Sequence, residues 1–376
     1  MGTRLADLNG DGLTDLVRAY TIYVYPTLFS YTLAWKNNGT GWENMPWSFP
    51  NCSAAGNNAG CFSDTGTDTG VRLADLNGDG LVDVVKAKRA GGAQNTYTWI
   101  NNGTGWRSVN WSFPACAGSN WTGCFVDAGE ANPDTGTRLV DINSDGLVDV
   151  VRAYHTNGPT TYTLTWLNNG TGWELVNWSY PGCVAGNATG CFSDTGLDMG
   201  TRLVDLDSDG LVDVIRSYTT SGSTYTYTWI NNGTGWQPLN WSFFNCTLSG
   251  NNAGCFTDTN MDLGVRLLDF NGDGLIDIFK ASSNSEVPTQ LAWKNNGFAN
   301  YLLDRIDLSL GGGISLSYQK STSLNNTGND TQSDLDFNIW LVFNITKNNN
   351  VSGTQNTLSS TVYNFSNGMY DYRDRE

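Results

Sequence analysis

The sequence has little basic character and almost no histidine. Among its 376 residues, 20 Lys and Arg stand against 36 Asp and Glu, the formal net charge is -16, and His155 is the single histidine. Nucleic-acid binding needs a basic surface, so a nucleic-acid partner is not expected. The chain also lacks G-x-S-x-G, a phosphate loop and a second histidine. These absences give catalysis little support, and we expect a non-enzymatic protein.

Long apolar runs and helical periodicity are missing as well. No run approaches the roughly 20 residues of a transmembrane helix, so this chain is not expected to span a membrane. Hydrophobic residues make up 39%, aromatic residues 12% and charged residues 15%, which is typical of a globular β-rich protein. The opening "MGTRLADLNG" has no basic-then-apolar leader. Because it matches Met199–Leu203 inside a later repeat, we expect the natural protein to extend upstream.

The sequence does contain a nine-residue acidic segment that recurs five times. "DLNGDGLTD" begins at Asp7, and its relatives begin at Asp75, Asp141, Asp205 and Asp269, at spacings of 68, 66, 64 and 64 residues. Each full unit continues through "TYTWINNGTGW"-like and "NWSFP"-like segments to a loop flanked by cysteines. Regular self-similarity of this kind is typical of a repeat architecture.

The repeats predict an all-β fold. Val, Ile, Leu, Tyr, Thr and Trp fill the apolar runs, Gly, Asn, Asp and Pro separate them, and "NNGTG" is a hairpin signal. About four strands per unit favour a β-propeller with blades of about 65 residues, and an array of β-sandwiches is the alternative. We place the propeller repeats at residues 1–297. The part that follows, residues 298–376, is predicted to be a smaller β segment, with a hairpin turned by Gly311–Gly313 and strands within 337–349 and 358–372.

The acidic segments have the chemistry of calcium loops. Side chains at positions 1, 3, 5 and 9 supply oxygen, position 7 offers its backbone carbonyl, and Gly at position 6 permits the sharp turn. Hard oxygen ligands on a flexible loop suit Ca²⁺ better than Mg²⁺, so about one Ca²⁺ per repeat, five in all, is predicted. The predicted ligands are Asp7, Asn9, Asp11, Leu13 and Asp15; Asp75, Asn77, Asp79, Leu81 and Asp83; Asp141, Asn143, Asp145, Leu147 and Asp149; Asp205, Asp207, Asp209, Leu211 and Asp213; Asp269, Asn271, Asp273, Leu275 and Asp277.

Three other interpretations of these loops were weighed. An EF-hand needs Glu at position 12 and helical flanks, whereas position 12 is always basic here and the flanks read as strands. A metal-free Asp/Asn/Gly turn is the simplest alternative. Five copies that keep the carboxylates favour a metal, because crowded carboxylates repel one another without a cation. A catalytic role for the ions is not expected, since no acid or base partner recurs beside them.

Cysteines, tryptophans and sequons also follow the repeat. The even number and regular positions of the cysteines predict disulfides within each loop and an oxidising compartment: Cys52/Cys61, Cys116/Cys124, Cys183/Cys191 and Cys246/Cys255. The three tryptophans of a unit, such as Trp99, Trp106 and Trp111, are expected to pack between blades, with a sugar-stacking platform as the alternative. Sequons permit glycosylation, although Asn- and Thr-rich turns also generate them by chance: Asn38, Asn102, Asn169, Asn232, Asn110, Asn177 and Asn240.

"RLADLNGDGLVDVV" followed by "TWINNGTGW" resembles the FG-GAP/VCBS repeats of integrin α-chains and microbial surface proteins. This resemblance covers residues 1 to about 297, and it implies a propeller with calcium in the strand-to-strand loop of each blade. "NYLLDRIDLSLGGGISLSYQKST" and "VYNFSNGMYDYRDRE" resemble the segment after the propeller in Rhs-type proteins and toxin-complex B subunits, which implies that the chain continues beyond Glu376. It also implies a large secreted or surface protein in which the propeller docks other parts.

The sequence therefore predicts a non-enzymatic, calcium-stabilised extracellular or cell-surface scaffold. Its expected partner is a protein or a cell-surface receptor, reached by docking or adhesion. A glycan-binding propeller, with sugar sites built from residues such as Trp42 and Trp106 and the cysteine loops, is the runner-up. An enzyme acting on polysaccharides is a distant third hypothesis.

Overall fold

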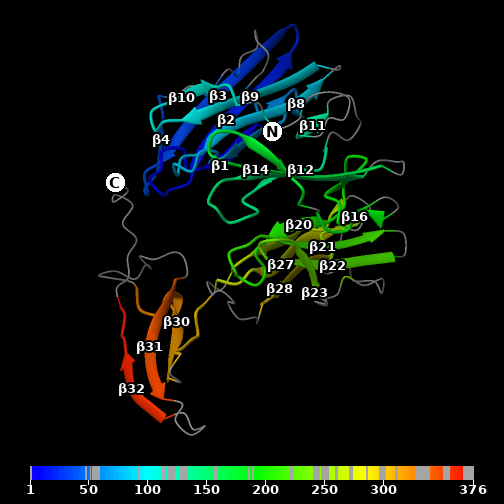
Figure 1. The fold of residues 1–376 in the computed structure, drawn as a ribbon. Helices are drawn as coiled ribbons and strands as arrows, with labels where there is room; N and C mark the ends of the chain where they lie inside the picture. The colour runs from blue at the N-terminus through cyan, green and yellow to red at the C-terminus, as the bar shows by residue number, and fades with distance from the viewer. Residues whose placement is uncertain are drawn as a thin grey trace. The chain divides into compact units, whose positions relative to one another are not determined.

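The computed structural model is almost entirely β-structure over the residues that it describes (Figure 1), which confirms the all-β prediction. One short 3-10 turn, Ser321–Ser323, is the only helical element in that part of the chain. No helix among the same residues is long and apolar enough to cross a membrane. The described residues are 2–46, 49–50, 52, 60–90, 93–111, 113, 116, 123–127, 134–155, 160–178, 180–184, 187–188, 190–220, 223–239, 246, 254–258, 261–270, 274–284, 287–295, 302–309, 312–326, 339–349 and 356–366.

The first repeat shows the topology that the others follow. The first, short strand runs antiparallel to the start of the long second strand. The second strand forms a hairpin with the long third strand, and the third pairs on its other side with a short fourth strand at the sheet edge. A further short strand pairs in parallel with the far end of the first long strand. The elements are β1 (Thr3–Ala6), β2 (Asp15–Val24), β3 (Thr27–Asn37), β4 (Trp42–Asn44), β5 (Ser63–Asp64) and β6 (Thr67–Asp68).

Three further repeats each build a sheet of the same kind. The second contains β7 (Val71–Ala74), β8 (Asp83–Ala90), β9 (Ala93–Asn101), β10 (Trp106–Val109) and β11 (Val126–Asp127). The third contains β12 (Thr137–Val140), β13 (Asp149–His155), β14 (Thr161–Asn168), β15 (Trp173–Val176), β18 (Ser193–Asp194) and β19 (Leu197–Asp198), beside the small pair β16 (Cys183–Val184) and β17 (Asn187–Ala188). The fourth contains β20 (Thr201–Val204), β21 (Asp213–Thr220), β22 (Ser223–Asn231), β23 (Trp236–Leu239), β24 (Thr257–Asp258) and β25 (Met261–Asp262).

The end of the chain is also β-structure. The fifth repeat forms a three-stranded sheet from β26 (Val265–Leu268), β27 (Asp277–Asn284) and β28 (Val287–Trp293). A four-stranded antiparallel sheet follows, and its first pair is the predicted hairpin, with Gly312 and Gly313 at the start of the second strand and Gly311 outside the described residues. This sheet consists of β29 (Arg305–Asp307), β30 (Gly312–Lys320), β31 (Trp340–Asn349) and β32 (Asn356–Val362).

Among the described residues, three hydrophobic clusters each join one repeat to the next. One cluster packs Val17 and Phe62 of the first repeat against Val84 and Trp99 of the second. The other two join the second repeat to the third and the third to the fourth in the same way. Because the sheet of the third repeat packs on both of its neighbours, the first five residues of β13 are all buried. The sheets of the first four repeats therefore pack against one another in chain order.

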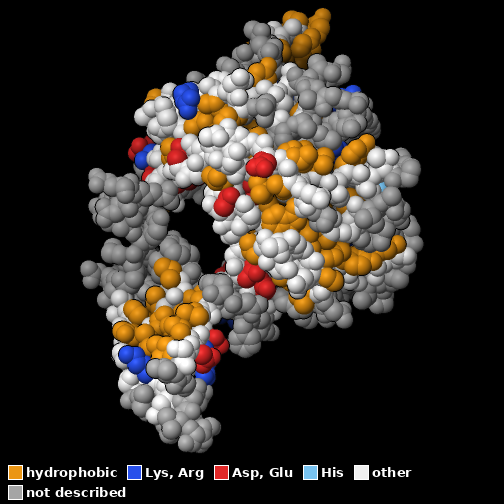
Figure 2. All heavy atoms as spheres, in the orientation of Figure 1, with side chains coloured by type: hydrophobic (Ala, Val, Ile, Leu, Met, Phe, Trp, Pro, Cys, Tyr) orange, Lys and Arg blue, Asp and Glu red, His pale blue; other side chains and the backbone are white. Residues whose placement is uncertain are grey.

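Contacts divide the chain into two compact units, Met1–Val204 with Leu211–Gly264, and Asp205–Gly210 with Val265–Glu376. The predicted division into residues 1–297 and 298–376 stays a prediction, as does the arrangement of the sheets into a propeller. In the second unit, the strands β30 and β31 are only half-buried along almost their whole length. Figure 2 shows hydrophobic side chains gathered on this sheet.

Candidate metal centres in the repeated loops

The five acidic loops all connect the first strand of a repeat to its second. In the first repeat the loop lies between Ala6, which ends β1, and Asp15, which begins β2, and these two residues pair with each other. The other loops follow Ala74, Val140, Val204 and Leu268 and end where β8, β13, β21 and β27 begin. Flanking strands replace the helices that an EF-hand would need, as the sequence predicted.

The first loop folds around its own carboxylates. The two oxygens of Asp7 accept hydrogen bonds from the backbone N–H groups of Gly10 and Gly12, both at 2.8 Å. Asp11 accepts the N–H of Leu13 at 2.9 Å and the side-chain amide of Asn9 at 3.0 Å. Gly10 and Gly12 have φ of 75° and 84°, a conformation that favours glycine. Positions 1, 3 and 5 are therefore brought together on one turn.

Position 9 of every loop is a fully buried aspartate. Asp15 accepts the N–H of Leu8 at 2.9 Å through one oxygen and the N–H of Asn37 at 2.8 Å through the other. The same two bonds recur at Asp83 and Asp149. A carboxylate oxygen can accept more than one hydrogen bond or cation contact, so this aspartate ties the loop to the hairpin and retains acceptor capacity. The five residues, each 0% exposed, are Asp15, Asp83, Asp149, Asp213 and Asp277.

Burial raises the pKa of three of these aspartates, Asp15, Asp83 and Asp149. The pKa of Asp83 is raised to about 7, chiefly by burial and in smaller part by the neighbouring Asp79 and Asp75, although hydrogen bonds from the backbone of Asn101 and Leu76 act to lower it. The pKa of Asp149 rises to about 6 for the same reasons. Burial disfavours the ionised form of a carboxyl group unless a positive charge compensates it. A cation at the loop would supply that compensation.

The first loop carries a compensating charge of its own. Lys36 lies 3.0 Å from Asp11. Burial acts to raise the pKa of Asp11, but hydrogen bonds from Asn9, Leu13 and Lys36 outweigh it and hold that pKa below its usual value. In the next three repeats the residue corresponding to Lys36 is apolar, as at Ile100.

The fourth loop brings the most carboxylates together. Carboxylate oxygens of Asp205, Asp207 and Asp209 lie within 4.8 Å of one another, the only such group of three acidic or metal-binding side chains among the described residues. Burial raises the pKa of Asp205, and the neighbouring Asp209 and Asp207 add to the effect. This donor set fits a hard cation such as Ca²⁺. In the fifth loop Asn271 and Asp273 lie outside the described residues, and the full ligand sets stay predictions.

Sequence inspection missed a second recurring motif, D-x-G-x-R. Arg72 binds both carboxylate oxygens of Asp68, and Arg138 does the same with Asp134. Arg138 also lies 5.2 Å from the centre of the Phe192 ring. In the same position, Arg202 pairs with Asp198. The four-residue spacing from Asp to Arg in each repeat was the available signal.

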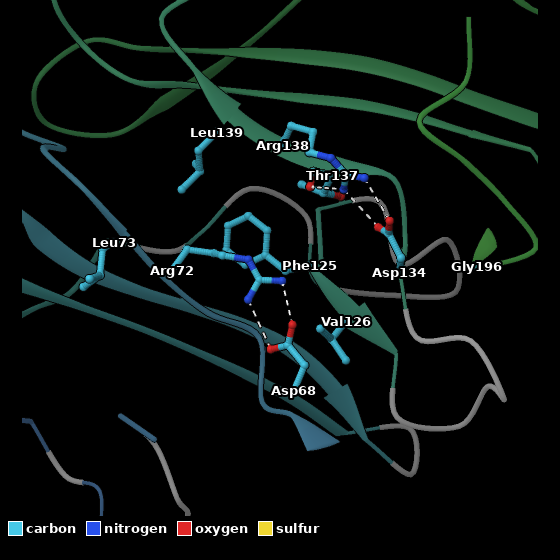
Figure 3. Close-up of a pocket in the computed structure, with 10 residues that line it drawn as sticks. All are labelled: Asp68, Arg72, Leu73, Phe125, Val126, Asp134, Thr137, Arg138, Leu139 and Gly196. Carbon is cyan, nitrogen blue, oxygen red and sulfur yellow. Dashed lines mark hydrogen bonds and ion pairs between the residues drawn. The ribbon is translucent and has the colours of Figure 1, made fainter. Parts of the chain in front are cut away.

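Two of these ion pairs line a groove of about 500 Å³ (Figure 3). Arg72 and Asp68 point toward one another on one side, and Arg138 and Asp134 do so on the other. Each aspartate also accepts the N–H of the glycine two residues later, at 2.7 Å for Asp68 and 2.9 Å for Asp134. Both oxygens of each carboxylate are therefore engaged within the turn itself. The two ion pairs fix the turns that lead into β7 and β12, the first strands of the second and third repeats.

The predicted disulfides are confirmed. All four bonds join the two cysteines of one loop, with Cα–Cα distances of 4.6 to 4.8 Å. No free cysteine remains.

The tryptophans of the second repeat, Trp99, Trp106 and Trp111, pack against neighbouring repeats. Trp99 is buried in the first cluster, and Trp106 meets Phe49 of the preceding repeat edge-on at 5.5 Å between ring centres. Trp42 is different, with 54% of its surface exposed.

Six of the seven predicted sequon asparagines are exposed, and Asn240 lies outside the described residues. His155 is 3.0 Å from Asp194.

Together these observations define a class, an all-β repeat protein with one acidic loop and one disulfide per full repeat. Residues 243–376, less than half of the chain, match the family model for the insecticide toxin TcdB middle/N-terminal region. A chain in the structure of a Photorhabdus luminescens Tc holotoxin pore matches this whole chain with a TM-score of 0.59 and 18% identity. This chain covers 15% of that one. No curated protein matches.

These findings support the toxin-complex part of the resemblance. The family model covers the predicted β segment after the repeats and the fifth repeat before it. At 18% identity, the structural match concerns the fold. The FG-GAP/VCBS part of the resemblance stays a prediction.

Proposed function

We propose that this chain is a non-enzymatic, calcium-stabilised scaffold within a larger, extracellular toxin-complex-like protein. In this proposal the five repeats are blades of a β-propeller that docks a protein partner or cell-surface receptor. The observation that carries it is the repeated unit itself: each repeat has one acidic loop between its first two strands, and each of the first three sheets packs on the next. Four disulfides suit an oxidising, extracellular setting.

The toxin-complex assignment rests on the matched family and on the solved relative, which is part of a Tc holotoxin pore. Because this chain spans a small part of that relative, we propose a role as one module of a longer protein. Docking is favoured over catalysis because the described carboxylates that recur with the repeat are engaged within their own loops and in Arg–Asp pairs, as at Asp7 and Asp134.

Bound calcium would neutralise carboxylates that the fold buries or crowds. Positions 1, 3, 5 and 9 of each loop would hold the ion with their side chains and position 7 with its backbone carbonyl, and the ion would compensate the charge of the buried aspartate at position 9. Thermal unfolding in calcium and in chelator tests this. Calcium should raise the melting temperature by several degrees, and Asp145→Ala should diminish that rise, while the exposed control Glu174→Gln should leave it intact. An identical melting temperature with and without calcium would refute the calcium claim.

Glycan binding remains the second candidate because Trp42 is exposed. Trp106, which the sequence offered as a companion platform, packs against Phe49 instead. A glycan array decides between the two functions. Specific hits that disappear with Trp42→Ala would favour the lectin, and an array without hits would favour the scaffold.

A further inference from the structure

In the second, third and fourth repeats a buried asparagine joins the repeat to the acidic loop of the repeat before it. The side-chain amide of Asn101, at the end of β9, donates to the carbonyl of Leu8 at 2.6 Å. Asn168 donates to the carbonyl of Leu76 at 2.6 Å, and Asn231 to that of Ile142 at 2.9 Å. All three asparagines are at most 2% exposed. The acceptor is always the residue at position 2 of the neighbouring loop.

The same asparagine also holds its own loop. The backbone N–H of Asn101 donates to Asp83, the buried aspartate at position 9, at 2.7 Å. The neighbouring acceptor, Leu8, in turn donates its N–H to Asp15 at 2.9 Å. A continuous run of hydrogen bonds thus connects position 9 of one loop to position 9 of the next.

This run extends over more than two repeats. Asn168 donates its backbone N–H to Asp149 and its side-chain amide to Leu76, whose N–H reaches Asp83. Within the second unit, Asn295 repeats the arrangement with Asp277 at 2.7 Å and the carbonyl of Leu206 at 3.1 Å.

Neighbouring loops also touch directly. A Cβ built on Gly10 would lie 2.8 Å from Cδ2 of Leu81, which stands at position 7 of the next loop. A Cβ built on Gly78 would lie 3.0 Å from Cδ2 of Leu147 in the same way. A change in the conformation of one loop would therefore alter its packing against the leucine of the next loop.

We propose that the buried asparagines are positioning residues that couple calcium binding between neighbouring repeats, so that the loops bind calcium cooperatively. This inference rests on the proposed function, because it presupposes that the loops bind calcium. Ordering the first loop fixes the Leu8 carbonyl, which holds Asn101, which holds Asp83 in place for the second loop. The second loop is then already partly ordered, so binding of the second ion costs less conformational entropy. This produces positive coupling between the two sites.

The coupling predicts an effect at a distance. Asp11→Ala, which removes a ligand from the first loop, should weaken calcium binding in the second loop by about fivefold or more, the lower end of typical coupling. The same loss should follow in the first loop when Asp79→Ala disables the second, because coupling between binding sites is reciprocal.

The test combines these variants with Asn101→Ala and the matched control Asn102→Ala, in which the next asparagine, exposed in the turn, is removed. Isothermal titration calorimetry with CaCl₂ gives the affinities and the Hill coefficient. Hydrogen exchange of the segment Leu5–Asp15 reports the order of the first loop. We expect a Hill coefficient above 1 that falls in Asn101→Ala and is unchanged in Asn102→Ala. In the Asn101→Ala background, Asp79→Ala should no longer change exchange in Leu5–Asp15 at limiting calcium.

The outcomes separate the two proposals. A purely structural Asn101 would lower stability equally with and without calcium and leave the Hill coefficient intact, which would overturn the coupling. Calcium binding with a Hill coefficient of 1, and no effect of Asp11→Ala on the second loop, would overturn the coupling and leave the calcium scaffold standing. An absence of any calcium binding would refute the scaffold's calcium as well. If Asn101→Ala does not fold, Asp11→Ala and Asp79→Ala decide the matter alone.

Discussion

At the scale of single residues, the aspartate at position 9 of each acidic loop stands where the loop meets the second strand of its repeat. The motif predicted that it completes a calcium shell. The structure shows in addition that Asp83 accepts two backbone N–H groups from different segments and is entirely buried. This aspartate therefore links loop, strand and hairpin, and replacing it should disturb the sheet as well as the ion.

The raised pKa values of Asp83 and Asp149 predict an unusual pH dependence in calcium-free buffer. Both groups bind more protons folded than unfolded between about pH 4 and pH 7, so the free energy of unfolding should fall as pH rises through this window. Each unit of difference in pKa corresponds to about 1.4 kcal/mol. Urea unfolding at pH 4.5 and pH 7 measures the trend, and saturating calcium should flatten it. A calcium-free protein that gains stability over this range would contradict the prediction.

The glycine of the D-x-G-x-R turn occupies a position where a side chain would be strained. Gly136 has φ of 68°, and a Cβ there would lie 2.5 Å from the carbonyl oxygen of Ala153. Gly136→Ala should therefore destabilise the protein by roughly 1–3 kcal/mol. Gly172→Ala is the control, because a Cβ at Gly172 meets nothing within 4 Å and should change stability by less than about 0.5 kcal/mol. Equal unfolding midpoints for the two variants would rule out the strain.

At the scale of elements, the alternation of apolar runs and turn residues was enough to predict strands. The hairpin at "NNGTG" forms as expected, with the N–H of Asn102 donating to the carbonyl of Gly105 at 3.1 Å. The short strands were harder to predict. Residues Val126–Asp127 pair with β8 in parallel, a contact across nearly forty residues that no local pattern reports.

The aromatic contacts between sheets give a prediction at this scale. Trp106 packs on Phe49 of the preceding repeat, whereas Trp42, at the same position of the first repeat, is exposed. Trp106→Ala should cost about 2–4 kcal/mol, and Trp42→Ala less than about 1 kcal/mol. Chemical unfolding compares the two variants. A similar loss in both would mean that packing between the sheets does not depend on this tryptophan.

At the scale of the whole molecule, the disulfides are confined to one unit. All four lie within Met1–Val204 and Leu211–Gly264. Each closes a loop of eight or nine residues and should stabilise its unit by about 2–3 kcal/mol. Reduction and alkylation should therefore raise hydrogen exchange in the first unit. Exchange in β30, in the second unit, should stay unchanged, and increased exchange there would show that the two units unfold together.

The sequence by itself determined the repeat, the all-β class, the place of the acidic loops between strands and the pairing of the cysteines. Each of these depends on residues near one another in the chain, so a local pattern carries the information. Only the tertiary structure decided that Asn101 reaches Leu8, that Trp106 packs while Trp42 is exposed, and that Asp83 is buried. The Asn101–Leu8 hydrogen bond joins residues 93 positions apart. Trp106 contacts a residue of the preceding repeat, and the burial of Asp83 depends on the folded surroundings, so none of these features leaves a local signal in the sequence.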